Sequence, residues 1–518
     1  MEQLKTLPIG IQDFEKLRKD GYLYIDKTEL IYKLIKGGNY YFLSRPRRFG
    51  KSLLMSTIHA VFDGKRELFD GLAIADKQDV DWVKHPVLHL DLNTNKYDAK
   101  DVLEKKLDDS LSKWEREYDC RRTDLPLGMR FEKVIQSAYD KTGQRVVILI
   151  DEYDKPMLQA IGNDELQNEY RGILKGFYGA LKSKDGCIKF ALLTGVTKFG
   201  KVSVFSDLNN LEDISMDLEL HNICGLTEEE ITVALKEYVK VLAKANDMTF
   251  DETLDKLRKM YDGYHFHPKG CGMYNPFSVL NTFKKKEFGS YWFETGTPTY
   301  LAELLRKHNY NLEKMATCQT TAKVLDSIDP NSTSPIPVIY QSGYLTIKSY
   351  DPQFKLYTLG FPNEEVEEGF VDFLMPYYMP VDRIDTAFNI QQFVLDVNAG
   401  NTDGFIKRLK SFFADTPYEL VKDQENHYQN VIWIICKLMG FHVQAEYHTS
   451  EGRIDLVLQT QKFCYVMEFK LDGTAEEALA QIEDKHYTLP FEQNGQKIIR
   501  IGMNFSKEMR NIDKVIIE

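Results

Sequence analysis

The chain lacks any long hydrophobic run. No apolar stretch approaches the roughly 18 residues that a membrane-spanning helix needs, which argues against contact with a membrane. Residues 1–12 lack a basic segment followed by an apolar core, and this pattern predicts no secretory signal. Internal repeats and low-complexity blocks are also missing. The composition, 43% apolar and 28% charged, is instead typical of a globular protein.

Closely spaced cysteines are missing too. The seven cysteines are scattered and include no Cys-x-x-Cys, which predicts free thiols in a reducing, cytoplasmic setting and argues against disulfides or a thiolate zinc site. Basic residues are in deficit, with 66 Lys and Arg against 78 Asp and Glu and a net charge of −12. General binding of polyanions is therefore excluded, and any nucleic-acid contact must come from local basic patches.

One basic turn stands between an apolar run and an amphipathic segment. Tyr40-Tyr41-Phe42-Leu43 leads into this turn, and Gly50-Lys51-Ser52 then opens the segment at 53–62. Strand, loop, Gly-Lys-Ser and helix follow each other in a phosphate-binding P-loop, where backbone N–H groups at a helix N-terminus cradle phosphate oxygens. We expect Lys51 to reach the β- and γ-phosphates of ATP and Ser52 to ligate Mg²⁺. The residues expected around the nucleotide are Arg47, Arg48, Phe49, Gly50, Lys51, Ser52 and Leu53.

Arg45 stands where the usual pattern GxxxxGK[ST] has its first glycine. The loop therefore carries a large basic side chain at a position where most P-loops have glycine. Three destinations are open for Arg45, Arg47 and Arg48: the nucleotide phosphates, a neighbouring subunit of a homo-oligomer, or neither. A basic surface turn before a helix is the alternative explanation of the whole stretch.

Five consecutive aliphatic residues, 146–150, predict a strand that is buried on both faces, as in the centre of a parallel sheet. Asp151 and Glu152 follow at its C-terminal end, where ligands bind in open α/β sheets. We expect Asp151 to hold Mg²⁺ and Glu152 to polarise the attacking water. A charged cap on a buried strand is the alternative. Thr194 ends the next predicted strand, 188–195, and either touches the γ-phosphate or the water, or simply terminates the strand.

A strand predicted at 87–92 lies in the sequence between the P-loop strand and the Asp151 strand. Together with Glu152, this order favours the additional-strand, catalytic-glutamate division of P-loop ATPases over the kinase–GTPase division. We therefore expect an α/β multidomain protein that begins with a parallel sheet covered by helices on both faces. The predicted divisions are a P-loop domain at 1–225, a helical lid and winged-helix-like region at 226–350, a helical connector at 351–415 and an α/β domain at 416–518. Helices in the middle of the chain are predicted at 228–246, 250–260, 299–308, 363–375 and 388–413.

Residues 416–518 carry a second chemical pattern. A helix is predicted at 425–439 with Glu425 in its first turn, followed by strands at 441–447, 452–459 and 463–470, a helix at 474–486 and a strand at 497–503.

The two strands before the second helix are expected to form a hairpin with a two-residue turn at Gln461-Lys462. In that register Asp455 lies opposite Glu468, and Glu468 and Lys470 share a face because side chains alternate along a strand. Two carboxylates suit a hard cation such as Mg²⁺, and a neighbouring ammonium helps to activate water, which together favour metal-assisted hydrolysis of a phosphodiester. The alternative is an ion-pair cluster on a solvated sheet face.

These residues resemble the core of the PD-(D/E)XK nuclease superfamily, with Asp455 as the first acid and Glu468-Phe469-Lys470 as the ExK motif. The whole chain resembles bacterial proteins with an N-terminal AAA-ATPase-like domain and a C-terminal PD-(D/E)XK domain. The hallmarks of that group are Tyr24-Ile25-Asp26-Lys27-Thr28, Arg45-Pro46-Arg47-Arg48-Phe49-Gly50-Lys51-Ser52 and Tyr340-Gln341-Ser342-Gly343-Tyr344-Leu345.

The resemblance implies a cytoplasmic ATPase coupled to a nuclease that uses Mg²⁺ or Mn²⁺. It also implies Glu425 as a third, helix-borne acid at the metal and Gln481 as a residue that positions substrate or water. We therefore expect an ATP-dependent enzyme that cleaves DNA or RNA. Two alternatives stay open: an ATP-switched module that binds nucleic acid or protein without cleavage, and a nucleotide-sensing scaffold with neither activity.

Overall fold

A computed structural model divides the chain into two compact units. Unit 1 comprises Met1–Thr295 and Gln319–Glu365, and unit 2 comprises Gly296–Cys318 and Val366–Glu518. The finer four-part division expected from the sequence stays a prediction. Within the described residues, no helix is long and apolar enough to cross a membrane. The seven cysteines are free thiols.

The structure describes residues 4–93, 95–198, 208, 210–293, 301, 302, 305, 310–312, 315, 318–326, 334–378, 383–414, 424–440, 442–449, 452–509 and 511–518. Within these ranges the backbone alone is described at 383–389, 414, 424–426, 429, 442–449 and 452–454. The helix predicted at 299–308 falls largely outside the described residues.

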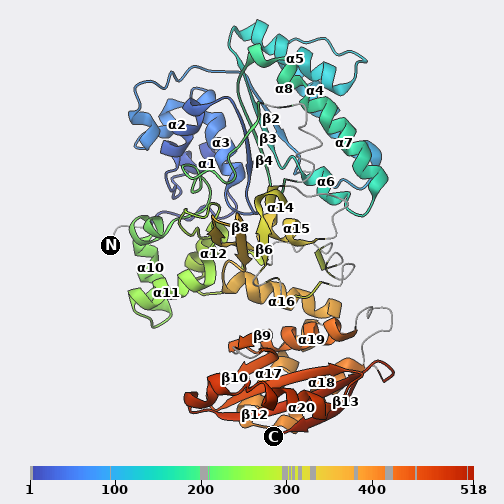
Figure 1. The fold of residues 1–518 in the computed structure, drawn as a ribbon. Helices are drawn as coiled ribbons and strands as arrows, with labels where there is room; N and C mark the ends of the chain where they lie inside the picture. Colours follow the sequence, from blue (N-terminus) through green and yellow to red (C-terminus); the bar gives the residue numbers. More distant parts are fainter. Residues whose placement is uncertain are drawn as a thin grey trace. The chain divides into compact units, whose positions relative to one another are not determined.

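Unit 1 is built on a five-stranded parallel sheet of order β2-β3-β4-β1-β5 (Figure 1). Its strands are β1 (Tyr40–Ser44), β2 (Val87–Asp91), β3 (Val146–Asp151), β4 (Ile188–Gly195) and β5 (Glu212–Asp213). Every residue of β3 is buried, as the run of aliphatic side chains predicts. The predicted fold class, an α/β multidomain protein with a parallel sheet, is confirmed.

The strand order agrees with the additional-strand division expected from the sequence, and it shows which strand is the additional one. The strand inserted between the P-loop strand β1 and the Asp151 strand β3 is β4, which comes later in the chain. The strand predicted from position 87, β2, lies beyond β3 at the sheet edge. Sequence order is a poor guide here because each parallel connection crosses over the sheet and is free to skip positions.

Helices lie on both sides of this sheet, with α1, α2 and α3 on one side and α5, α7 and α8 on the other in Figure 1. The helices are α1 (Phe14–Lys19), α2 (Thr28–Gly37), α3 (Lys51–Phe62), α4 (Lys100–Glu117), α5 (Leu127–Thr142), α6 (Lys155–Gln159), α7 (Asp164–Tyr178) and α8 (Ala180–Ser183). A buried two-bond ion pair joins α4 to α5, because Arg130 Nε and Nη2 lie 2.8 and 2.9 Å from the two oxygens of Glu115.

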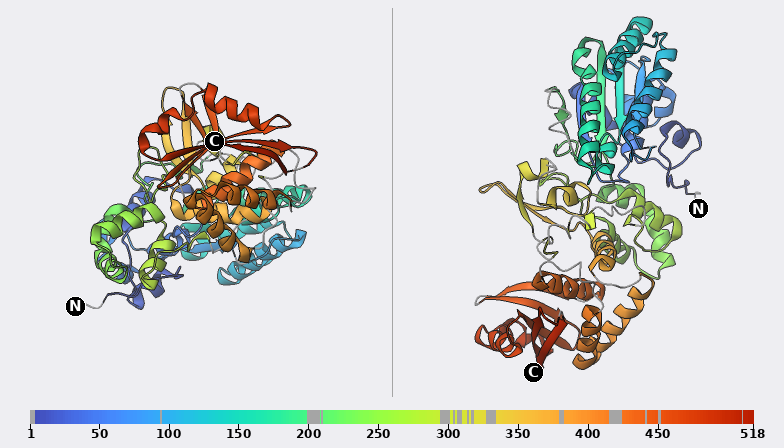
Figure 2. Two further views of the ribbon diagram at one scale, coloured as in Figure 1. Left: turned by 90° about the horizontal axis from the view of Figure 1, so that it is seen from below. Right: turned by 90° about the vertical axis from the view of Figure 1, so that its right-hand side faces the viewer.

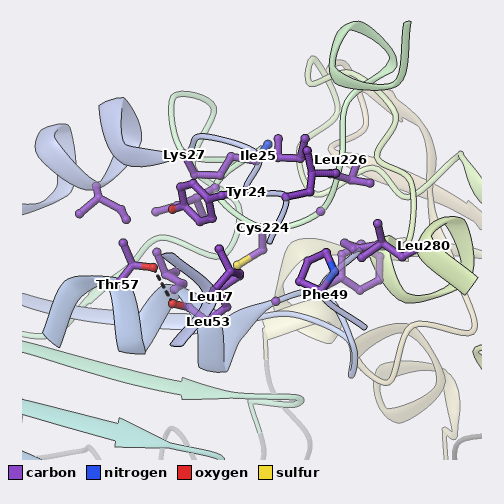
Figure 3. Close-up of a pocket in the computed structure, with 18 residues that line it drawn as sticks. Leu17, Tyr24, Ile25, Lys27, Phe49, Leu53, Thr57, Cys224, Leu226 and Leu280 are labelled. Carbon is purple, nitrogen blue, oxygen red and sulfur yellow. Dashed lines mark hydrogen bonds between the residues drawn. The ribbon is translucent and has the colours of Figure 1, made fainter. Parts of the chain in front are cut away.

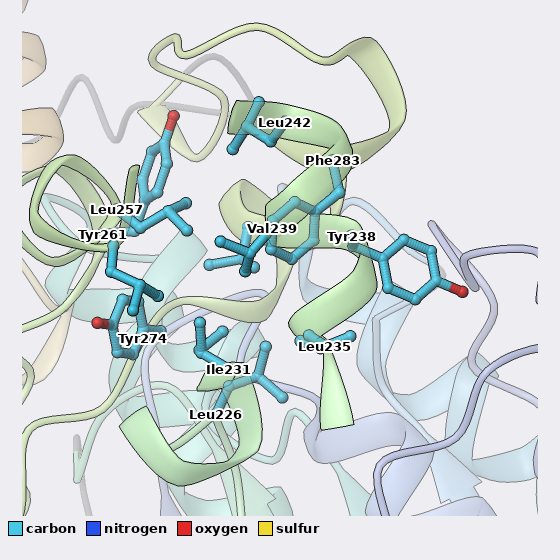
Figure 4. Close-up of a cluster of buried hydrophobic side chains, with 12 residues drawn as sticks. Leu226, Ile231, Leu235, Tyr238, Val239, Leu242, Leu257, Tyr261, Tyr274 and Phe283 are labelled. Carbon is cyan, nitrogen blue, oxygen red and sulfur yellow. The ribbon is translucent and has the colours of Figure 1, made fainter. Parts of the chain in front are cut away.

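A helical subdomain follows the sheet in unit 1. It contains a π-helical turn (Glu230–Ala234), α10 (Lys236–Ala245), α11 (Phe250–Tyr261) and α12 (Pro276–Lys285). Its apolar side chains form one buried cluster around Ile231, Val239, Leu257 and Phe283 (Figure 4). A capping box opens the subdomain, since Thr227 and Glu230 exchange two hydrogen bonds of 2.8 and 3.2 Å.

The rest of unit 1 is a small three-stranded sheet with two short helices. The sheet has the order β6-β8-β7, and all pairs are antiparallel. The elements are β6 (Gln319–Thr321), α14 (Ala322–Asp326), α15 (Ile336–Gln341), β7 (Thr346–Asp351) and β8 (Leu356–Gly360). Two helices followed by a hairpin is the element order expected of a winged-helix-like unit.

Unit 2 contains a five-stranded mixed sheet of order β13-β12-β11-β10-β9, in which only β11 and β12 run parallel. Its strands are β9 (His442–Thr449), β10 (Gly452–Gln459), β11 (Phe463–Leu471), β12 (Lys497–Ser506) and β13 (Asn511–Ile517). β13 is not among the predicted strands, because Lys514 lies between Ile512 and Ile516 on one face and neither face is uniformly apolar.

The helices associated with unit 2 are α16 (Glu364–Tyr378), α17 (Arg383–Ala399), α18 (Thr402–Ala414), α19 (Gln424–Leu438) and α20 (Ala475–Asp484). The single helix predicted at 388–413 is wrong, since the structure has two helices, α17 and α18. Gly400 breaks them with a φ of +72°. A Cβ at Gly400 would lie 2.7 Å from the Phe463 ring, so the sharp turn needs glycine.

Candidate active sites

The P-loop connects β1 to α3, as the sequence predicts. Gly50 precedes the helix with a φ of +94°, and Arg48 is also left-handed with a φ of +66°. Left-handed residues in such a turn help to direct backbone N–H groups toward one side, as in the anion-binding nests of P-loops. The Lys51 side chain is 4% exposed, and its Nζ donates to the carbonyl oxygens of Arg45 at 3.1 Å and Pro46 at 3.3 Å.

Two predicted residues, Ser52 and Thr194, both donate to the carboxylate of a third, Asp151, and the three come from different segments of the chain. Ser52 Oγ, at the start of α3, donates to Asp151 Oδ2 at 2.6 Å. Thr194 Oγ1, near the end of β4, donates to Asp151 Oδ1 at the same distance. Asp151 and Thr194 are buried. Neighbouring strands of a parallel sheet end at one edge, so the β4 insertion brings Thr194 between the P-loop and Asp151.

Glu152 follows Asp151 with a φ of +54°, a left-handed backbone that a non-glycine residue rarely adopts. Such a conformation costs on the order of 1–3 kcal/mol and clusters at functional positions. Its Oε1 lies 3.4 Å from Lys51 Nζ. The strained backbone therefore directs the carboxylate toward the P-loop lysine.

Arg45 has a structural position in the loop. Its buried guanidinium donates to the carbonyl oxygens of Ser44 (2.9 Å), Ser215 (2.7 Å) and His221 (3.3 Å), and lies 4.0 Å from the centre of the Phe266 ring. Burial lowers the pKa of Arg45 to about 10. Of the three destinations left open by the sequence, these contacts within unit 1 favour the third for Arg45, neither phosphate nor subunit.

Arg47 and Arg48 lie over aromatic rings. The Arg47 guanidinium is 4.8 Å from the Trp292 ring centre, and that of the exposed Arg48 is 5.2 Å from the Phe277 ring centre. The indole Nε1 of Trp292 also donates to the Arg47 carbonyl at 3.0 Å. The helical subdomain thus contacts the P-loop directly through Phe277 and Trp292.

The hallmark at 340–345 supports the same loop. Gly343 has a φ of +90°, and a Cβ there would lie 2.6 Å from the Pro46 side chain. Gln341 Oε1 accepts the Lys198 N–H at 2.6 Å, and Gln341 Nε2 donates to the Leu325 carbonyl at the same distance. The segment after β4 and the P-loop are therefore both held by α15 and the turn that follows it.

Asp154 is an acid whose place the sequence did not reveal. It is fully buried and accepts hydrogen bonds from the N–H groups of Val196 (3.2 Å) and Thr197 (2.6 Å) and from the Thr197 hydroxyl (2.7 Å). Burial is the main cause that raises the pKa of Asp154 to about 6, and the negative charge of Glu152 acts in the same direction. Its one sequence signal is a third acid within four residues of Asp151.

A largely apolar cavity of about 110 Å³ opens beside the P-loop (Figure 3). Four segments of the chain, within 8–31, 49–57, 223–226 and 276–280, converge on it, so sequence patterns could not find it, although the hallmark at 24–28 marks one wall. Its labelled lining residues are Leu17, Tyr24, Ile25, Lys27, Phe49, Leu53, Thr57, Cys224, Leu226 and Leu280. Gly50 also lines it, which places the cavity next to the phosphate-binding turn. Lys27 at its edge pairs with Glu230 at 2.6 Å.

In unit 2 the predicted hairpin register is confirmed. Leu456 pairs with Met467 and Gln459 with Cys464, which is the register that a two-residue turn at Gln461-Lys462 sets. Continued by one residue, it places Asp455 beside Glu468. Asp455 Oδ2 accepts the N–H of Phe469 at 2.8 Å, so the carboxylate is directed to the neighbouring strand.

Glu468 is 3% exposed, and its two oxygens differ. Oε1 lies 3.5 Å from Lys470 Nζ, whereas Oε2 is buried and has no hydrogen-bond partner among the described residues. Burial, and then the charge of Asp455, raises the pKa of Glu468 to about 8. A buried carboxylate oxygen without a donor is costly unless a cation serves it.

Gln481 completes a chain of polar contacts from α20. Lys470 Nζ donates to Gln481 Oε1 at 2.5 Å, and Gln481 Nε2 donates to the Tyr487 hydroxyl at 3.4 Å. Tyr487 is buried in the apolar cluster with Val457, Cys464 and Phe491. The structure therefore brings Asp455, Glu468, Lys470 and Gln481 together.

The donor set fits a hard divalent cation held by two carboxylates, because the unpartnered Glu468 oxygen and Asp455 supply the oxygen ligands such ions prefer. Among the described side chains, no three His, Cys, Asp or Glu residues cluster as a metal site. Glu425 lies in the first turn of α19, and its side chain is outside the described part.

Comparison with known proteins gives two family matches. Residues 8–205 match a family described as predicted AAA-ATPase, and residues 423–515 match the PD-(D/E)XK nuclease superfamily. The first range contains the residues around Asp151, and the second contains those around Glu468. The chain is also 35% identical to an uncharacterized protein in the vnfD 5′ region of Azotobacter chroococcum mcd 1, with 99% of each chain covered.

Proposed function

Because this chain belongs to the bacterial AAA-ATPase-like proteins that carry a C-terminal PD-(D/E)XK nuclease superfamily domain, we propose that it hydrolyses Mg-ATP and thereby controls metal-dependent cleavage of nucleic acid. The coarse statement, an ATPase-like domain joined to a nuclease-superfamily domain, rests on the family matches. The two activities and the coupling between them are the proposal.

The observation that supports ATP hydrolysis best is the Asp151 carboxylate, which accepts hydrogen bonds from Ser52 and Thr194 at 2.6 Å each. Hydroxyl and carboxylate oxygens are the ligands that Mg²⁺ prefers, and Mg²⁺ neutralises charge on the phosphates. Lys51 would bind the β- and γ-phosphates in place of the loop carbonyls, and Glu152 would orient the attacking water. Thr194 would hold Asp151 or reach the γ-phosphate itself.

The cavity beside Gly50 would receive the base of the nucleotide. Its walls of Leu, Ile, Phe and Tyr side chains suit the faces of a flat aromatic ring. Its position next to the first turn of α3 fits a ligand whose phosphates lie in the P-loop. Arg47 and Arg48 would border the phosphates while packing on Trp292 and Phe277.

Cleavage is supported by the pairing of two carboxylates with one ammonium at Asp455, Glu468 and Lys470. Asp455 and Glu468 would hold Mg²⁺ or Mn²⁺, with Glu425 as a further ligand, and the cation would supply Lewis acidity at the scissile phosphate. Lys470 would hold the attacking water or the phosphate oxygen. Gln481 would fix the Lys470 ammonium through its 2.5 Å contact.

The deciding experiment is a cleavage assay on single- and double-stranded DNA and RNA with Mg²⁺ or Mn²⁺, each with and without ATP. Lys51→Ala is expected to abolish ATP hydrolysis, and the double variant Asp455→Ala with Lys470→Ala is expected to abolish cleavage while ATP hydrolysis continues. Unchanged ATP turnover in Lys51→Ala contradicts the P-loop assignment. Absence of cleavage of every substrate contradicts the nuclease assignment.

The net charge of −12 favours a second candidate, an ATP-switched module that grips nucleic acid or protein without cutting it. A pure binder has no need of two facing carboxylates of which one, Glu468, is buried. Calorimetric titration of Mg²⁺ into the wild type and Glu468→Gln separates the two candidates, because only the enzyme requires a cation that depends on Glu468.

A further inference from the structure

The ribbon formed by β7 and β8, residues 346–360, carries aromatic residues, and β6 continues the sheet beyond β8 by pairing with residues 356–358. The right-hand view of Figure 2 shows the ribbon extending away from the helices of the same unit. Tyr350 pairs directly with Tyr357 across the strands, and their ring centres are 4.5 Å apart. Directly opposed residues point to the same face of a hairpin, so the two rings form one aromatic surface.

The exposure of this ribbon is unusual for its residue types. Phe354, at the tip, is 65% exposed, and Tyr350 is 36% exposed. Other aromatic side chains of unit 1, such as Tyr344 and Trp292, are almost fully buried. The exposed Phe354 ring contributes little to the hydrophobic core, so the stability of the fold does not explain an aromatic residue at this position.

The turn of the ribbon shows a second feature that folding does not require. Lys355 has a φ of +55°, a left-handed conformation in which Gly or Asn would be less strained. The side chain of Lys355 is exposed. Asp351 Oδ1 accepts the N–H groups of Gln353 (2.8 Å) and Phe354 (3.1 Å), so the one acid of the ribbon serves the turn. The cationic side chain of Lys355 thus stands beside Phe354 although the left-handed backbone at this position disfavours a lysine.

We propose that the ribbon at 346–360 binds single-stranded nucleic acid, with Phe354 and the Tyr350–Tyr357 pair stacking on unpaired bases and Lys355 contacting a phosphate. Aromatic faces stack on any unpaired base, and adjacent lysines contact the backbone. The ribbon carries two lysines and one aspartate, a positive balance in a chain of net charge −12. Lys348 donates to the Pro362 carbonyl at 3.1 Å, so Lys355 is the lysine that the proposal assigns to a phosphate. The inference rests on the proposed function and names its docking surface.

The test is fluorescence anisotropy of a labelled oligothymidylate of about 20 nucleotides with the full-length protein, made in the Asp455→Ala background so that the probe is not cut. Phe354→Ala and Phe354→Leu are expected to raise the Kd about tenfold, whereas Phe354→Trp should bind at least as tightly as the parent. Val233→Ala is the matched control, because Val233 is an equally exposed apolar residue of unit 1 outside the ribbon. It should leave the Kd unchanged.

Lys355→Gly separates binding from stability, since glycine relieves the strained turn while removing the charge. It should melt no lower than the parent, bind more weakly and reduce the slope of log Kd against log salt by about one. A Phe354→Leu variant that keeps full affinity while Phe354→Ala loses it indicates an apolar protein-like contact and overturns the proposal.

Failure of the ribbon and failure of the proposed function give different results. If the parent binds the probe and all ribbon variants bind it equally, the ribbon proposal alone is overturned. If the parent binds no oligonucleotide and the chain with intact Asp455 cuts none, both are overturned.

Discussion

The Nζ of Lys51 lies 3.4 Å from Oε1 of Glu152, so the P-loop cation and the acid after Asp151 form an ion pair across the end of the sheet. The pair joins the first residue of α3 to a strained residue after β3. Under the proposed function, the phosphates of ATP compete with Glu152 for this ammonium. Nucleotide binding would then release the carboxylate that orients the attacking water.

Glu152→Gln is expected to lower the kcat of ATP hydrolysis about 100-fold or more while ATP still binds, because the amide cannot accept the proton of the attacking water. Turnover by phosphate release and binding of a fluorescent ATP analogue measure the two effects separately. Lys51→Ala is the comparison, since it should lose binding as well. A Glu152→Gln variant that hydrolyses ATP at the parent rate would remove Glu152 from the mechanism.

Asp154→Asn is expected to change the pH dependence of stability. The folded pKa of Asp154, about 6, lies above the value of an exposed carboxyl, so its contribution to stability is complete below about pH 4 and is lost as the pH rises through 6. The free energy of unfolding of the variant, relative to that of the wild type, should therefore rise by up to about 2–3 kcal/mol between about pH 4 and pH 8.

Urea unfolding at both pH values measures this difference, which is independent of any constant penalty from the altered hydrogen bonds of the amide. A variant whose free energy of unfolding differs from the wild type by the same amount at both values would show that Asp154 is ionised normally.

Local periodicity and turn length were enough to predict β3, the P-loop and the β10–β11 hairpin. The hairpin register follows because a two-residue turn fixes every later pair, and the pair Leu456–Met467 bears this out. The position of β4 beside β1, the burial of Arg45 and the cavity near Gly50 were not predictable in this way. Each depends on segments that are more than a hundred residues apart, such as Arg45 with Ser215, and no local pattern records such packing.

Arg45→Gly restores the glycine usual at this position of a P-loop, and it is nevertheless expected to destabilise unit 1 by about 3–5 kcal/mol. The variant removes the donor that Arg45 supplies to the carbonyl oxygens of the buried Ser215 and of His221, and it removes the contact with Phe266. Arg48→Ala is the matched control, because the exposed Arg48 should change stability by no more than about 0.5 kcal/mol. Equal melting of the two variants would show that Arg45 has no structural role.

Gln481→Leu is expected to lower cleavage about 10- to 100-fold, less than Lys470→Met does, because the Lys470 ammonium survives and loses only its fixed position. Tyr487→Phe should have a smaller effect, since the hydroxyl contact to Gln481 is long at 3.4 Å. Single-turnover cleavage rates rank the three variants. A Gln481→Leu rate equal to the wild-type rate would show that Lys470 needs no partner on α20.

Divalent cations are expected to stabilise unit 2 through Glu468. In the absence of nucleotide, Mg²⁺ should raise the melting temperature of the wild type, because a cation that binds only the folded state stabilises it by about 2.7 kcal/mol at a hundred times its Kd. Glu468→Gln should remove this shift, since the unpartnered Oε2 is the oxygen that the cation would serve. Glu483→Gln, on the exposed side of α20, should keep it. Without a cation, Glu468→Gln should melt no lower than the wild type, because a neutral amide is easier to bury at this position than a carboxylate. If Mg²⁺ shifts the melting temperature of Glu468→Gln and Glu483→Gln equally, the cation binds elsewhere, and Asp455 and Glu468 are only an ion-pair cluster with Lys470.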